Sequence, residues 1–178
     1  MTFNGVSAAF TVSSATAIQA TVPAGATTGT LSVTTPGGTA TSTGSFTVVN
    51  PPTITSFTPT SGLVGTSVTI SGTNFTGATA VAFNGVSASF TVTSDTTIEA
   101  TVPEGATTGP VSVTTPGGTP TSANNFTVQE TLTATNAGTG SGTITADSGP
   151  INCGATCSAF YEYGTVVTLT ATPATGST

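Results

Sequence analysis

The chain has 178 residues, of which 3% are charged and 35% are hydrophobic. It carries six acidic residues, no Lys, Arg or His, and a formal net charge of −6 at pH 7. Nucleic acids and anionic membranes are bound through basic side chains that neutralise phosphates, so the composition excludes both as partners. Catalytic arrangements that need His or Lys are excluded for the same reason.

Val, Ile and Thr recur along the whole chain, whereas disordered chains are poor in β-branched residues. A folded multi-strand protein is therefore expected. No apolar run approaches the roughly 20 residues that span a bilayer. The first residues, Met1 to Gly5, also lack the basic and apolar regions of a signal peptide.

A long internal repeat organises the chain. Residues 4–48 recur at 84–128, and 33 of the 45 aligned positions are identical. Met1 aligns with Val81, so the first copy lacks the counterparts of two strands and part of a third. We expect this partial sandwich to expose strand edges that another chain could fill. The repeated features are turn residues and the alternation of apolar with hydroxyl side chains. Both are typical of a structural scaffold.

The complete copy predicts seven short strands at the spacing of a β-sandwich. In chain order they are expected near Thr53–Phe57, Ser67–Ser71, Val81–Phe83, Phe90–Val92, Ile98–Val102, Val111–Val113 and Phe126–Val128. Asn84-Gly85 predicts a two-residue hairpin turn because both residues tolerate positive φ values, with Phe90 and Val92 on the returning strand.

Several segments of this copy resemble the IPT/TIG family of immunoglobulin-like domains. They are Pro52-Thr53-Ile54-Thr55-Ser56-Phe57, Gly62, Gly65-Thr66-Ser67-Val68-Thr69-Ile70-Ser71-Gly72-Thr73-Asn74-Phe75, Val81-Ala82-Phe83-Asn84-Gly85 and Ala100-Thr101-Val102-Pro103. The resemblance covers residues 52–128 fully and 1–49 in part. It implies tandem all-β immunoglobulin-like sandwiches of the E-set type, found in bacterial surface and secreted proteins, with no catalytic residues to transfer.

The pattern changes after Gln129-Glu130. Residues 131–178 resemble a divergent and truncated InlB B-repeat module of bacterial surface proteins. The segments that carry this likeness are Thr131-Leu132-Thr133-Ala134, Gly138-Thr139-Gly140-Ser141-Gly142-Thr143-Ile144, Ile151-Asn152-Cys153-Gly154-Ala155-Thr156-Cys157 and Gly164-Thr165-Val166-Val167-Thr168-Leu169-Thr170-Ala171-Thr172-Pro173. A partial small β-repeat module is therefore expected at this end.

Cys153 and Cys157 are the only two cysteines. Because the resemblances imply an oxidising, secreted context, we expect a local disulfide, with two free thiols as the alternative. The six acids are scattered, so neither a catalytic carboxylate pair nor a metal site is expected. No cofactor is expected.

Sugar binding by small β-modules uses exposed aromatic rings, and the chain has no Trp. Tyr161 and Tyr163 fall on one strand face. The family pattern places Tyr161 in the core, which leaves Tyr163 as the candidate ligand contact.

Two hypotheses follow for function. The first is a non-catalytic structural or adhesive module array, a stalk or scaffold of a bacterial extracellular or cell-surface protein. Its partners would be neighbouring modules and surface glycans or host or cell-surface proteins. The second is a set of accessory carbohydrate-binding modules of a secreted polysaccharide-acting enzyme.

Overall fold

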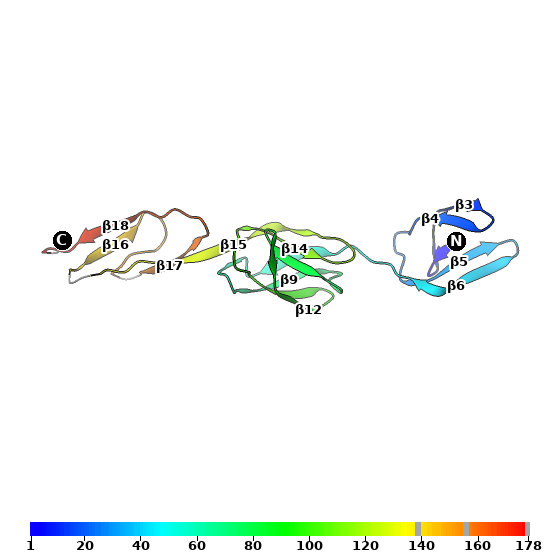
Figure 1. Cartoon of the computed structure of the whole chain (residues 1–178), viewed down its shortest axis with the longest axis horizontal. Helices are drawn as coiled ribbons and strands as arrows, with labels where there is room; N and C mark the ends of the chain where they lie inside the picture. The colour runs from blue at the N-terminus through cyan, green and yellow to red at the C-terminus, as the bar shows by residue number, and fades with distance from the viewer. Residues whose placement is uncertain (138–139, 155–156, 177–178) are drawn as a thin grey trace. The chain divides into compact units, whose positions relative to one another are not determined.

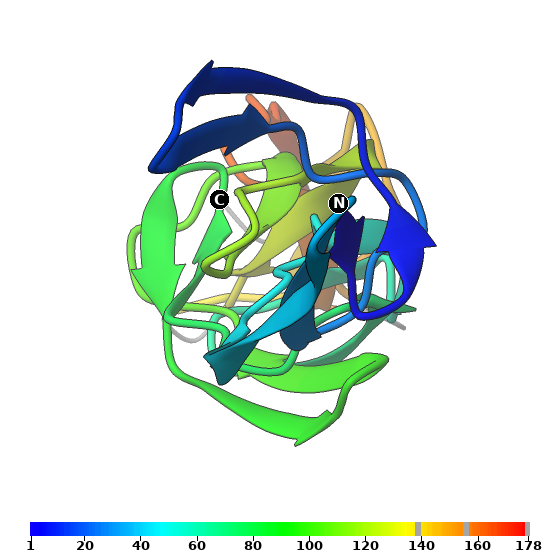
Figure 2. The same ribbon diagram turned by 90° about the vertical axis from the view of Figure 1, so that its right-hand side faces the viewer.

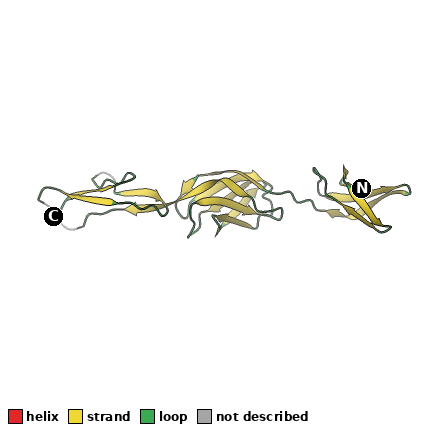
Figure 3. Ribbon diagram, turned by 90° about the horizontal axis from the view of Figure 1, so that it is seen from above, coloured by secondary structure: helices red, strands yellow, loops and turns green. Residues whose placement is uncertain are grey.

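The computed structural model describes residues 1–137, 140–154 and 157–176. In these ranges every regular element is a strand, and no helix occurs (Figure 3). The predicted all-β class is therefore confirmed. The chain divides into two compact units, Met1–Asn50 (unit 1) and Pro51–Thr178 (unit 2).

Unit 1 consists of a four-stranded sheet and a separate hairpin (Figures 1 and 2). The sheet has the order β2-β1-β5-β6, and the hairpin pairs β3 with β4. Their bounds are β1 Thr2–Phe3, β2 Val6–Ser7, β3 Phe10–Ser14, β4 Ala17–Ala20, β5 Gly29–Thr35 and β6 Gly38–Phe46.

Unit 2 begins with a β-sandwich of two sheets. The first sheet has the order β12-β13-β9-β7, and the second has the order β11-β10-β14-β15-β17, with β8 paired to β15. The sandwich strands are β7 Thr53–Thr58, β8 Ser61–Gly62, β9 Ser67–Thr73, β10 Ala80–Phe83, β11 Val86–Ala88, β12 Phe90–Ser94, β13 Thr97–Thr101, β14 Gly109–Thr114 and β15 Thr121–Thr133.

The core of the sandwich lies between the two sheets because apolar side chains alternate with hydroxyl side chains along the strands. In β9, Val68 and Ile70 are fully buried, as the alternation predicts. The other buried members of the core are Phe57, Phe75, Val81, Phe83, Ile98, Ala100, Val102, Ala106, Val111, Val113, Phe126 and Val128.

The predicted hairpin turn at Asn84-Gly85 is confirmed, but the predicted returning strand is wrong. Asn84 and Gly85 have φ values of 46° and 86°, as a type I′ turn requires. The strand that returns beside β10 is β11, whereas Phe90 and Val92 lie on β12, which pairs with β13 in the opposite sheet. The chain changes sheet at this point, and alternation alone does not reveal which neighbour a strand pairs with.

The rest of unit 2 is a smaller module built on the end of β15. Its strands are β16 Gly142–Ala146, β17 Ser158–Glu162 and β18 Leu169–Pro173. Here β17 pairs with β15, and β16 pairs with β18. The small core is formed by Ala134, Ile151, Cys153 and Ala159, with Leu132, Ile144, Ala146 and Tyr161 packed against it.

Candidate functional site

The strands near the two ends of the sandwich pair directly with each other. β8 runs parallel to β15, with Ser61 opposite Thr127 and Gly62 opposite Val128. The N–H of Thr127 donates to the carbonyl oxygen of Thr60 over 3.0 Å. This pairing connects the chain entering the sandwich to the strand that leaves it.

β15 continues beyond the sandwich without a break. Its first part pairs with β14, and residues Gln129 to Thr133 pair with β17 (Figure 1). The hydroxyls of Thr133 and Ser158 lie 2.9 Å apart at the far end of this pair. One 13-residue strand therefore belongs to the backbone ladders of both the sandwich and the small module.

Val128 lies at the junction between these ladders and is fully buried. Its N–H donates to the Thr108 hydroxyl over 3.0 Å, and its carbonyl oxygen accepts from the Tyr163 N–H over 2.8 Å. Because buried backbone groups are costly to leave unpaired, these bonds fix the small module to the sandwich at this residue.

The candidate ligand contact, Tyr163, lies directly after β17, and its side chain is 54% exposed. Tyr161 is half-buried against the small core and donates its hydroxyl to the Ser148 carbonyl oxygen over 2.8 Å. Phe160, on the opposite face of β17 from Tyr161, is 59% exposed. Sequence reasoning missed Phe160, although the alternation around buried Ala159 is a signal that could have found it.

A depression of about 300 Å³ lies beside the β15–β17 pair. Its lining includes the two carboxylates of this region and one aromatic ring, and Tyr163 is not part of it. The lining residues are Glu130, Thr131, Leu132, Tyr161, Glu162, Gly164, Thr165 and Val167.

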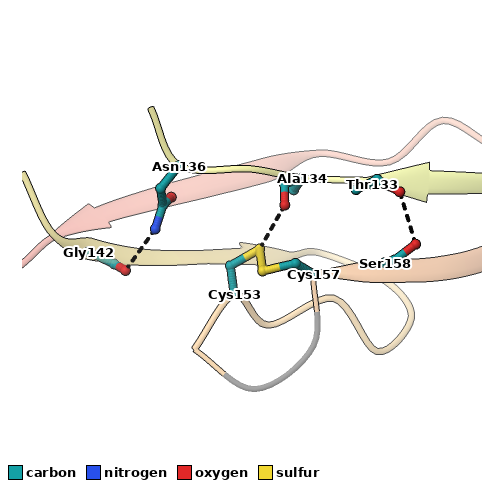
Figure 4. Close-up of a disulfide and its surroundings, with 7 residues drawn as sticks. All are labelled: Thr133, Ala134, Asn136, Gly142, Cys153, Cys157 and Ser158. Carbon is teal, nitrogen blue, oxygen red and sulfur yellow. Dashed lines mark hydrogen bonds between the residues drawn. A yellow bond between two sulfur atoms is a disulfide. The ribbon is translucent and has the colours of Figure 1, made fainter. Parts of the chain in front are cut away.

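Cys153 and Cys157 form a disulfide, as the sequence predicts (Figure 4). Their Cα atoms are 4.6 Å apart, and Cys153 is buried in the small core. The Ala134 N–H donates to the Cys157 carbonyl oxygen over 2.7 Å, and the Cys153 N–H donates to the Ile144 carbonyl oxygen over the same distance. The disulfide therefore lies between β16 and the end of β15.

Three carboxylates serve as hydrogen-bond acceptors within the fold. Glu99 accepts from the hydroxyls of Ser67 and Thr69 across the β13–β9 pair. Hydrogen bonds from the Thr76 hydroxyl and N–H hold the pKa of Asp95 below its ordinary value of 3.8.

Asp147 is placed in the same way in the small module. Bonds from the Thr168 hydroxyl and N–H lower its pKa below 3.8. Within residues 1–137, 140–154 and 157–176, no three His, Cys, Asp or Glu side chains gather closely enough to hold a metal ion. The same residues contain no helix long and apolar enough to cross a membrane.

Comparison with known proteins gives one family match and several likenesses to solved structures. No curated protein sequence matches the chain. SGBP-B from a complex xyloglucan utilization locus in Bacteroides uniformis is 21% identical, with a TM-score of 0.43 over 78% of this chain and 41% of that chain. A gamma-CGTase from the alkalophilic Bacillus clarkii is 24% identical, with a TM-score of 0.40 over 62% of this chain and 18% of that chain.

An auxiliary nutrient binding protein from Bacteroides thetaiotaomicron is 20% identical, with a TM-score of 0.39 over 47% of this chain and 23% of that chain. The chain thus spans less than half the length of each of these structures. The IPT/TIG domain family matches residues 52–128. These residues form the two-sheet sandwich of unit 2, so the family match falls on the closed β-sandwich of the chain.

Proposed function

We propose that the chain is a non-catalytic structural array, a stalk or scaffold of a bacterial extracellular or cell-surface protein that takes part in adhesion. The observation that carries this proposal is β15, which joins two modules as one uninterrupted strand. The proposal includes the division into a partial IPT/TIG domain at 1–49, the complete domain at 52–128 and an InlB B-repeat-like module at 131–178.

The hydrogen-bond pattern suits a protein that carries tension. Force applied along β15 acts parallel to the β8–β15 ladder, so the hydrogen bonds between these two strands are loaded together. A hairpin that is pulled open at one end instead breaks its hydrogen bonds one at a time. The strand also transmits this force to β17 through five residue pairs. No flexible linker intervenes between the two ladders.

The chemistry supports an extracellular or cell-surface location in two ways. A disulfide is typical of oxidising compartments. A chain without Lys or Arg offers no cleavage site to proteases that recognise basic residues. Neighbouring modules of the same protein, surface glycans and host or cell-surface proteins are the partners that this role would use.

Coupling between the modules can be tested by hydrogen exchange of the full chain. Val113→Ala opens a cavity in the sandwich core and lowers its stability by about 2 kcal/mol. Because β15 is shared, amides of β17 should exchange faster in this variant. Val33→Ala changes the repeat-equivalent residue in unit 1 and serves as the matched control, which should leave β17 unchanged. Unaltered exchange of β17 in both variants would contradict the proposal.

A second candidate function is carbohydrate binding by accessory modules of a secreted polysaccharide-acting enzyme. The observation that favours it is the pair of exposed rings at Phe160 and Tyr163. Saturable binding on a polysaccharide array that is lost in Tyr163→Ala or Phe160→Ala would support it. Val166→Ala, which removes an exposed aliphatic side chain of the same module, should bind like the unchanged chain.

A further inference from the structure

The depression beside the β15–β17 pair has an aromatic wall that the fold holds in place. Tyr161 lines the depression, and its hydroxyl donates to the Ser148 carbonyl oxygen over 2.8 Å. A Cβ atom added at Gly149 would lie 2.7 Å from Cε1 of this ring, so the backbone of Gly149 packs against the ring. Ser148 and Gly149 therefore fix the position of the ring, and another part of it borders the depression.

A carboxylate lies next to this ring. Glu130 is directly opposite Tyr161 in the antiparallel register, so both side chains are on one face of the strand pair. The Cβ atoms of such a pair are about 4.5–5.5 Å apart. Leu132, two residues further along β15, is on the same face and lines the depression together with Val167. The depression thus combines a negative charge, an aromatic ring and two aliphatic side chains.

The charge of Glu130 is not paired within the chain. In the part of the chain that the structure describes, no group donates a hydrogen bond to this carboxylate, whereas Glu99, Asp95 and Asp147 all accept from Ser or Thr residues. The sequence contains no Lys, Arg or His, and Glu162 is a second acidic residue in the lining. A basic side chain that pairs with Glu130 must therefore come from another molecule.

We propose that this depression binds the side chain of an arginine residue on a partner protein. A guanidinium is planar, so it stacks on the Tyr161 ring while it donates hydrogen bonds to the Glu130 carboxylate. Its aliphatic stem packs against Leu132 and Val167. The volume of about 300 Å³ is at the lower limit for ligand pockets, which suits one side chain rather than a long glycan.

Charge identifies the class of partner. A second copy of this chain has no basic side chain to offer. A neutral glycan gains nothing from the net charge of −6, whereas a basic protein surface is attracted by it. Arginine is favoured over lysine because a guanidinium forms two parallel bonds with a carboxylate and stacks flat on a ring.

This inference rests on the adhesive role proposed above and specifies a partner for it. The test of the inference measures binding alone, whereas the structural role is tested by hydrogen exchange and by force. Loss of either property would therefore be seen separately from loss of the other.

The test titrates the full chain with N-acetyl-arginine amide and follows the tyrosine ring signals by NMR. The chain has only two tyrosines, so Tyr163→Ala identifies the signals of Tyr161 and, because Tyr163 is outside the depression, should leave the affinity unchanged. We expect saturable shifts of the Tyr161 ring with a millimolar dissociation constant. N-acetyl-citrulline amide has a similar shape without the charge and should bind at least about fivefold more weakly.

Two variants of equal net charge separate this site from general attraction. Glu130→Gln should weaken binding of the arginine probe by at least about fivefold, because the amide keeps the size of the side chain and loses its charge. Glu104→Gln removes the same charge from an exposed turn of the sandwich, outside the depression. This matched control should change the affinity by less than about twofold, because salt screens distant charges.

Any of four results would overturn the proposal. The first is no saturable shift of Tyr161 at tens of millimolar of the arginine probe. The second is equal binding of the citrulline probe. The third is equal weakening by Glu130→Gln and Glu104→Gln, which would show attraction by net charge alone. The fourth is saturable binding of cellohexaose at Tyr161 in place of the arginine probe, which would make the depression a glycan site.

Discussion

The ring of Phe126 meets the ring of Phe83 edge to face, with 5.1 Å between the ring centroids and 78° between the planes. The repeat reproduces this pair in unit 1, where Phe46 meets Phe3 at 5.1 Å and 82°. In unit 2, Phe57 of β7 adds a third ring, 6.2 Å from Phe126. The two pairs therefore share a geometry and differ in what surrounds them.

Phe126→Ala should destabilise unit 2 by about 3–5 kcal/mol, because it opens a cavity in a closed core. Phe46→Ala should destabilise unit 1 by only about 1–2 kcal/mol, since that ring is already partly in water. Exchange of amides in each unit, followed through denaturant titrations, separates the two values. Equal losses would show that Phe46 is buried in solution as completely as Phe126.

The two Asn residues of the hairpin turns offer a second matched pair. Asn84 and Asn4 have φ values of 46° and 44°, and each amide nitrogen donates over 2.8 Å to a Thr hydroxyl, that of Thr107 or Thr27. Each Asn→Ala change should cost about 1–3 kcal/mol, because it adds backbone strain and removes this bond.

Gly at either position accepts the positive φ and loses only the side-chain bond, so each Asn→Gly change should cost roughly half as much. Chemical denaturation of the Ala and Gly variants measures both effects. If Gly destabilised each turn as much as Ala, backbone strain would have no part in the effect.

Stability should depend on pH through Asp95. Its pKa is lowered in the folded chain by the Thr76 hydroxyl and N–H, so the folded state favours the carboxylate. This contribution is complete above the ordinary pKa of 3.8 and is lost as pH falls through the lower folded value. Asp95→Asn should therefore flatten the decline in the denaturation midpoint below pH 4, whereas an unchanged slope would contradict this assignment.

Removing the disulfide should affect the small module alone. The closed loop is short, so the chain-entropy model gives a loss of about 2 kcal/mol for the Cys153→Ser, Cys157→Ser double variant. Exchange should accelerate at β16 and at Ala134, while the amides of β9 keep their rates. Global unfolding of unit 2 in the double variant would show that the disulfide has more than a local role.

Local chemistry made the hairpin turns and most sandwich strands predictable. Asn84-Gly85 specifies its turn by its own φ preferences, and alternation in β9 specifies which side chains are buried. The continuation of β15 across Gln129-Glu130 could not be read in the same way. A change in composition marks a new pattern but does not reveal that the backbone ladder continues.

The parallel pairing of β8 with β15 was equally hidden in the sequence. β8 has two residues, too few to show a period, and its partner lies more than 60 residues later in the chain. Tyr163 was selected from its residue type and is exposed, whereas its role as a ligand contact stays a prediction.

The most direct test of the structural role is the force at which residues 52–128 unfold when the full chain is pulled from both ends. We expect a distinct unfolding event that releases roughly 25 nm of chain. Thr127→Pro removes the N–H that bonds to Thr60 and should lower this force more than Val113→Ala, which weakens the core without touching the β8–β15 pair. Unfolding without measurable resistance, or an equal drop in both variants, would contradict a load-bearing scaffold.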